Sequence, residues 1–79
     1  MKIDELNKLL LIKNVPKEAY SLAGGLPNEA FCLEKLKEGW HVYYSERGNK
    51  NTIGKYLHEE EACEALLNKL IKEIIIGGD

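Results

Sequence analysis

The spacing of apolar positions predicts a helix at each end of the chain. Apolar side chains recur at close to helical spacing in residues 3–14, where Asp4 is the expected N-cap and Pro16 prevents continuation. A second helix is expected from His58, with an acidic first turn that suits the positive helix end and with Gly77-Gly78 closing it. Its apolar stripe contains Cys63, Leu66, Leu67, Leu70 and Ile74.

Alternating apolar and polar positions between the helices predict a sheet. The expected strands are a short one at residues 19–23 and longer ones at residues 30–36, 40–47 and 52–57. We interpret Gly24-Gly25 as a turn rather than a phosphate-binding loop, because no Lys-Ser/Thr sequence follows. The order helix, short strand, three-stranded antiparallel meander and helix predicts one α+β domain over residues 1–79, with two layers and both helices on one sheet face.

The turn between residues 30–36 and 40–47 decides which side chains share a sheet face. We favour a three-residue turn with Gly39 left-handed, because a two-residue turn would place Lys35 and Lys37 beside Trp40 and Val42. The favoured register turns one set of residues toward the helices, with Glu34 as the misfit: Ala30, Cys32, Leu36, Trp40, Val42 and Tyr44. The opposite face then carries Phe31, Leu33, Lys35, His41, Tyr43, Ser45 and Arg47.

Composition and charge narrow the class of function. The chain has 44% apolar and 30% charged residues, as ordinary globular proteins do, and its net charge of −2 gives no basic excess for nucleic acid. Its start lacks a secretory pattern, and no apolar run approaches the roughly 20 residues that span a membrane. We therefore expect a cytoplasmic protein without a membrane partner, whose two cysteines stay reduced.

Catalytic and metal-binding patterns are missing from the sequence. His41 and His58 do not combine with the cysteines or carboxylates at a spacing typical of zinc sites. Cys32 and Cys63 occupy apolar positions, and Ser45 lacks the context of a nucleophile elbow. We expect no metal, no cofactor and no enzymatic activity.

An exposed patch is expected where Phe31, Leu33 and Tyr43 share the outer sheet face with Arg47, since aromatics and arginine are enriched at interface hot spots. The alternative is that another register makes this patch core. The acidic start of the second helix is either a solvated first turn or a rim for a basic partner. Likewise, Glu46 and Arg47 either bind a partner or tie their own loop. The predicted partner-binding residues are Phe31, Tyr43, Glu46, Arg47, Glu59, Glu60 and Glu61.

Several runs carry a resemblance to a known group of proteins. They are Tyr20-Ser21-Leu22 with Gly24-Gly25, Ala30-Phe31-Cys32-Leu33, the run from Gly39-Trp40 through Val42-Tyr43-Tyr44-Ser45-Glu46-Arg47-Gly48, and Glu60-Glu61-Ala62-Cys63. Together they resemble a small bacterial family with a W-x-V-[FY]-Y-S-E-R-G core that is similar to immunity proteins of polymorphic toxin systems. The resemblance implies a binding protein that neutralises a cognate toxin by direct contact, and it implies no catalytic residues.

Two other functions stay open. The order of elements resembles the double-stranded RNA-binding domain, but that family places a basic cluster at the start of its last helix. Here the corresponding run, from His58 to Glu64, contains four carboxylates. The other candidate is a homodimer of structural or regulatory role, formed through surplus apolar residues of the last helix. These residues are Leu66, Leu67, Leu70, Ile71, Ile74, Ile75 and Ile76.

Overall fold

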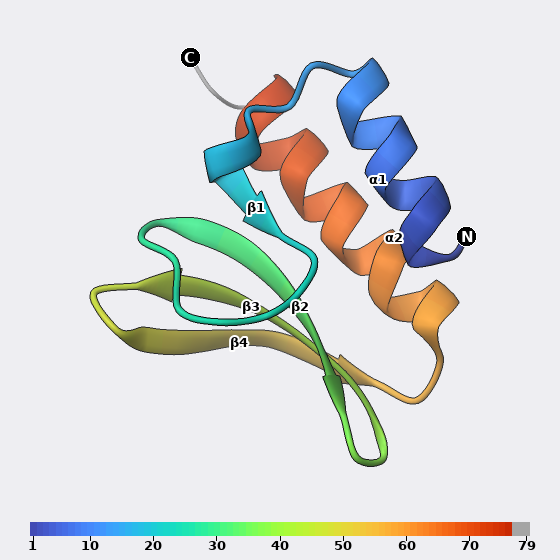
Figure 1. Ribbon diagram of the computed structural model, residues 1–79, viewed down its shortest axis with the longest axis vertical. Coiled ribbons are helices and arrows are strands. Elements are labelled where there is room, and N and C mark those ends of the chain that lie inside the picture. The colour runs from blue at the N-terminus through green and yellow to red at the C-terminus, as the bar shows by residue number, and fades with distance from the viewer. Residues whose placement is uncertain (77–79) are drawn as a thin grey trace.

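Two α-helices pack on one face of a four-stranded mixed sheet in the computed structural model of the chain (Figure 1). The structure describes the backbone of residues 1–76 and the side chains of residues 1–74. The predicted two-layer α+β arrangement is confirmed. The elements in chain order are α1 (Ile3–Ile12), the 3-10 helix η1 (Lys17–Ala19), β1 (Tyr20–Ser21), β2 (Ala30–Leu36), β3 (Gly39–Glu46), β4 (Asn49–Tyr56), α2 (Glu59–Leu70) and the π-helical segment η2 (Ile71–Ile76).

Element boundaries differ from the prediction at several ends, most clearly at the start of α1 and at the start of β4. Lys2, not Asp4, occupies the N-cap position of α1. β4 begins at Asn49 rather than at residue 52, because the turn after β3 uses only Arg47 and Gly48. The predicted helix end at Gly77-Gly78 lies outside the described residues.

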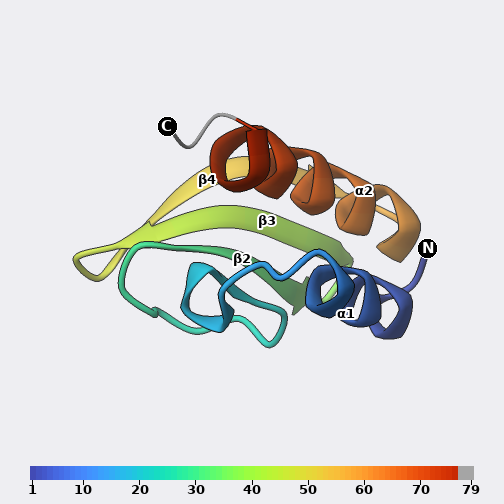
Figure 2. The ribbon, with the colours of Figure 1, turned by 90° about the horizontal axis from the view of Figure 1, so that it is seen from above.

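The sheet order is β1-β2-β3-β4, so β1 and β4 are its edge strands. β1 runs parallel to β2, and the other neighbours are antiparallel. Figures 1 and 2 show α1 and α2 side by side, with α2 the nearer to β4. A bulge interrupts the β3–β4 ladder, since Thr52 pairs with Tyr43 and Gly54 pairs with Val42. Ile53 is the extra residue.

The hydrophobic core lies between the helices and the sheet face that they cover. Leu6 and Leu10 of α1 and Leu66 and Leu70 of α2 are fully buried. On the sheet side, Phe31, Leu33 and Val42 are buried in the same cluster, and further residues pack around it. These include Trp40, Tyr44, Ile53 and Tyr56.

The predicted register of the β2–β3 hairpin is wrong. Leu36 pairs with Gly39 and Lys35 with Trp40, so the turn has two residues. The shift places Phe31 on the helix side, whereas the predicted register had placed Phe31 on the exposed outer face. It also moves Ala30 and Cys32 to the opposite face.

Two features of the hairpin end make this register acceptable. Lys35 is exposed and places its Nζ 4.8 Å above the ring of Trp40, so its charge is not buried. Gly39 suits this position for two reasons: its φ of 150° is one that other residues rarely adopt, and a side chain there would collide with the carbonyl oxygen of Tyr56. Lys37 lies in the turn, exposed, and not beside an aromatic core residue.

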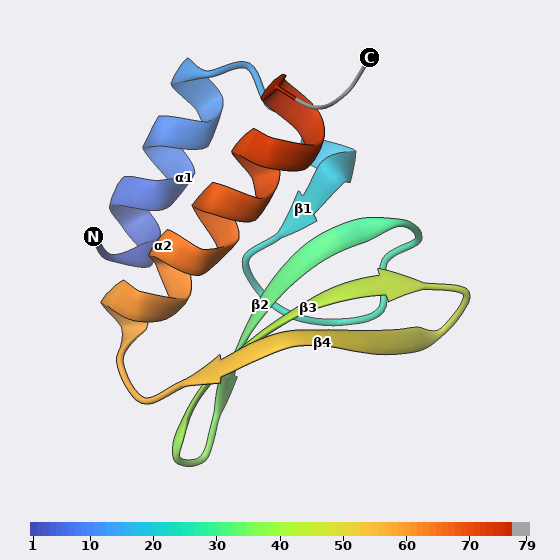
Figure 3. The ribbon, with the colours of Figure 1, turned by 180° about the vertical axis from the view of Figure 1, so that it is seen from behind.

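The loop of residues 22–29 covers part of the other sheet face. It connects β1 to β2 and passes in front of the strands in Figure 1 and behind them in Figure 3. The Tyr43 hydroxyl donates to the Gly25 carbonyl at 2.6 Å, and the Ser45 hydroxyl donates to the Pro27 carbonyl at 2.6 Å. Tyr43 is consequently 0% exposed. The expectation that it lies on an open patch is wrong.

The hydroxyl of Tyr43 should therefore anchor this loop. Tyr43→Phe removes the hydrogen bond but keeps the ring, and we expect the free energy of unfolding to fall by about 1–2 kcal/mol. Amide hydrogen exchange should also quicken in residues 22–29. Denaturant unfolding and exchange followed by NMR measure the two effects.

Tyr44→Phe is the matched control, because the Tyr44 hydroxyl has no hydrogen bond to a described residue and the ring is only half-buried. Its stability should change by less than about 0.5 kcal/mol. Equal destabilisation by the two substitutions would contradict a role for the Tyr43 hydroxyl in holding the loop.

Candidate protein-binding surfaces

A polar network lies on the sheet face that turns away from the helices. His41 Nδ1 is 2.9 Å from Glu34 Oε2, and His41 Nε2 is 2.9 Å from Thr52 Oγ1. Lys50 Nζ donates to both carboxylate oxygens of Glu34, at 3.1 and 3.2 Å. The hydrogen bond with His41, followed by the interaction with Lys50, holds the pKa of the Glu34 carboxyl below its usual value. The network joins β2, β3 and β4.

The order carboxylate, imidazole, hydroxyl is also that of a hydrolytic triad. However, His41 is only 7% exposed, and both of its ring nitrogens already have partners. A substrate would have to displace these contacts to reach the ring. We interpret the network as structural. The predicted three-residue turn could not reveal this network, because it placed Glu34 on the helix side as a misfit. In the observed register, Glu34 is the direct cross-strand partner of His41.

The two cysteines are buried and free. Burial raises the pKa of the Cys32 thiol, and it raises that of Cys63 to about 11. Both thiols are therefore protonated at neutral pH and act as small apolar side chains. Within residues 1–76, no group of three or more His, Cys, Asp or Glu residues could hold a metal ion.

The tip of the β3–β4 hairpin is formed by Arg47 and Gly48, both of which are exposed. Both residues have positive φ, 50° and 79°, which is the signature of a type I′ turn. Arg47 is exposed and forms no ion pair with any described side chain. Glu46 beside it is half-buried and does not tie the turn through Arg47.

The acidic start of α2 is partly used within the chain. Glu59 Oε2 accepts a hydrogen bond from the Ile3 backbone N–H at 2.8 Å, which ties the start of α2 to the first turn of α1. Lys2 Nζ lies 3.3 Å from Glu60 Oε2 and 3.8 Å from Glu59 Oε1. Glu61 is exposed and has no ion pair with a described residue.

The seven predicted partner-binding residues do not form one surface. Phe31 is 9% exposed in the core, and Tyr43 lies under the loop of residues 22–29. The hairpin tip and the start of α2 lie at opposite ends of β4, as Figure 1 shows. Eight residues of strand separate them, which is about 25 Å at about 3.3 Å per residue.

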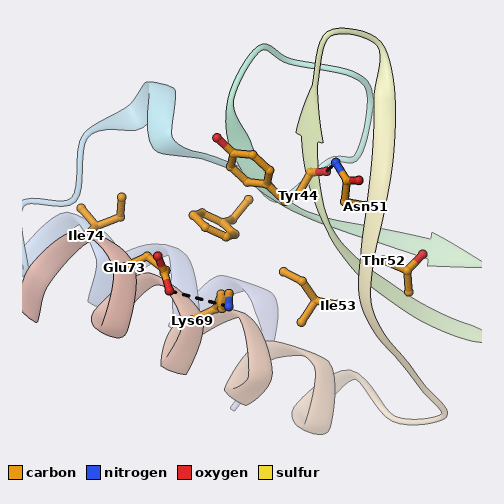
Figure 4. Close-up of a pocket in the computed structure, with 8 residues that line it drawn as sticks. Tyr44, Asn51, Thr52, Ile53, Lys69, Glu73 and Ile74 are labelled. Carbon is orange, nitrogen blue, oxygen red and sulfur yellow. Dashed lines mark hydrogen bonds and ion pairs between the residues drawn. The ribbon is translucent and has the colours of Figure 1, made fainter. Parts of the chain in front are cut away.

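A groove of about 490 Å³ opens between β4 and the C-terminal part of α2 with η2 (Figure 4). The rings of Phe31 and Tyr44 meet in it at a centroid distance of 4.7 Å. Lys69 and Glu73 form an ion pair of 3.7 Å on the helix side. The other lining residues are Asn51, Thr52, Ile53 and Ile74.

The surplus apolar surface expected on the last helix is largely used in the fold. Leu66 and Leu70 are fully buried, while Leu67 and Ile74 pack against the core. Ile75 and Ile76 were also predicted to add apolar surface, but their side chains lie outside the described ones. The premise for a homodimer through this helix is therefore weakened.

Comparisons with protein-family models, with curated proteins and with solved structures found no match. None of the helices in the described part of the chain has the length and apolar character needed to cross a membrane.

Glu34 should make the stability depend on pH. Its folded-state pKa lies below the usual 4.5, so its stabilising contribution is present above that value and lost as the pH falls through the folded-state pKa. At pH 7 we expect Glu34→Gln to unfold with a free energy about 1–2 kcal/mol lower than the native chain. The difference should shrink below about pH 4.

Urea unfolding at pH 7 and at pH 3 measures this difference. Glu38→Gln serves as a control, because Glu38 lies exposed in the β2–β3 turn and has no ion pair with a described residue. A destabilisation of Glu34→Gln that is the same at both pH values would argue against a charged Glu34 in the network.

Proposed function

We propose that this chain is a small protein-binding protein that contacts its partner through the tip of the β3–β4 hairpin. The sequence resemblance supports a more specific role, that of a bacterial immunity protein that neutralises a cognate toxin in the cytoplasm by direct binding. On this proposal the chain acts by occlusion and has no catalytic step.

The conformation of Arg47 is the observation that carries the proposal. A left-handed conformation costs an ordinary L-residue roughly 1–2 kcal/mol, and asparagine or glycine tolerates it better. Arg47 is a charged residue in that conformation, and it gains no ion pair within the described chain. Strained residues of this kind are concentrated at functional sites. An intermolecular contact would account for a residue that the fold alone disfavours.

Arginine also suits this role chemically. Its guanidinium can form two parallel hydrogen bonds with a carboxylate, and arginine is enriched among interface hot spots. A hairpin tip can enter a concave site, where a single side chain contributes strongly to affinity. The tip stands clear of the helix layer in Figures 1 and 3.

A double-stranded RNA-binding function is supported less well. The element order agrees with that domain apart from the additional short strand β1, but the start of α2 presents Glu60, Glu61 and Glu64 as exposed carboxylates. Carboxylates at this position would repel phosphates. A gel shift with duplex RNA at low salt tests this alternative, and no shift is expected.

Arg47→Asn separates binding from stability. The substitution creates an Asn-Gly turn, the preferred sequence for type I′, so we expect the free energy of unfolding to rise by about 0.5–1 kcal/mol. Affinity for the product of the neighbouring gene should fall by at least about tenfold, since a hot-spot arginine is lost. Denaturant unfolding and titration calorimetry measure the two quantities.

Lys37→Asn is the matched control, because it removes one cation from the tip of the other hairpin. It should leave affinity unchanged within about twofold. If no complex forms with the native chain, or if Arg47→Asn binds as well as Lys37→Asn, the proposed function is wrong.

A further inference from the structure

β4 is an edge of the sheet whose outer backbone groups have no strand partner within residues 1–76. In a type I′ turn the residues that flank the two central positions are hydrogen-bonded to each other, here Glu46 and Asn49. Hydrogen-bonded and non-hydrogen-bonded pairs then alternate along an antiparallel ladder. Tyr44–Asn51 is therefore hydrogen-bonded. The backbone N–H and C=O groups of Lys50 and Thr52 point away from β3.

The segment that forms this edge is basic. Residues 47–58 contain Arg47, Lys50 and Lys55 and no aspartate or glutamate, although the whole chain has a net charge of −2. Lys50 is paired with Glu34, whereas Arg47 and Lys55 have no ion pair with a described residue. An acidic segment would complement this edge.

The two sides of the edge differ in chemistry. Lys50, Thr52 and Lys55 pair with residues of the outer sheet face, so they lie on that side. The other side adjoins the groove, whose lining includes Ile53 and Tyr44 (Figure 4). A strand placed along β4 would turn alternate side chains toward the lysines and toward the groove.

We propose that the partner contributes an extended segment that adds to β4 as a fifth strand. Backbone hydrogen bonds to Lys50 and Thr52 hold the segment in place, as in other cases of strand addition. Its acidic side chains face Lys50 and Lys55, and its apolar side chains alternate with them and enter the groove. This inference rests on the proposed function, since Arg47 at the end of β4 contacts the same partner.

Lysines on an edge strand also protect a sheet against self-association. That protective role predicts no ordered partner strand, so the two explanations differ in what a complex would show. Protection alone would leave the amides of Lys50 and Thr52 exchanging freely in the complex.

Amide hydrogen exchange of the native chain, free and bound to the product of the neighbouring gene, tests the proposal. In the free chain, Lys50 and Thr52 should exchange fast and Asn51 slowly. In the complex, we expect Lys50 and Thr52 to slow by at least about tenfold, because each amide gains a hydrogen bond.

Proline at position 50 provides an independent test. Lys50→Pro removes an N–H that points away from β3, a position where edge strands tolerate proline. Lys50→Ala removes the same side chain but keeps the N–H. We expect Lys50→Pro to bind at least about tenfold more weakly than Lys50→Ala, with the melting of both variants checked by circular dichroism.

The outcomes separate this inference from the proposed function. A complex that is weakened by Arg47→Asn but leaves the Lys50 and Thr52 amides unprotected overturns the strand addition alone. Equal affinity of Lys50→Pro and Lys50→Ala does the same. The absence of any complex overturns both, and because the exchange measurement uses the native chain, it does not depend on the folding of a variant.

Discussion

The pairing of Glu34 with His41 across the β2–β3 hairpin sets the chemistry of both sheet faces. Because side chains alternate along a strand, this one pair sends Leu33 and Val42 to the helix side and Tyr43 to the opposite side. The polar face is then satisfied by its own hydrogen bonds. In this register, every buried side-chain nitrogen or oxygen of the described residues has a hydrogen-bond partner.

The outer face is consequently covered over Tyr43 rather than open there. Hydroxyl donors on β3 hold the loop of residues 22–29 over Tyr43, while Glu34, His41 and Thr52 connect three strands beside it. Gly24 permits this cover, since it is left-handed and a Cβ there would lie 3.0 Å from the Cβ of Glu34. Within the described residues, β4 stays an unpaired edge of the sheet.

The β3–β4 hairpin combines three features in one segment: a strained arginine at its tip, an edge strand without a carboxylate, and a groove beside that edge. The arginine departs from what folding alone favours, since Asn-Gly would make a better turn. At the other end of β4, Glu59 ties the two helices together, so part of the acidic start of α2 has a structural explanation.

The sequence by itself determined the order of elements, the two-layer class and the residues of β2, because apolar periodicity and turn residues act over a few positions. Trp40, Val42 and Tyr44 could also be assigned to the helix side from their alternation on β3. Only the tertiary structure decided the hairpin register and thereby the fate of Phe31 and Tyr43. Local turn preference allowed a two- or a three-residue loop, and the choice depended on contacts between distant segments. These are the close approach of Gly39 to Tyr56, the Glu34–His41–Thr52 hydrogen bonds and the loop that covers Tyr43.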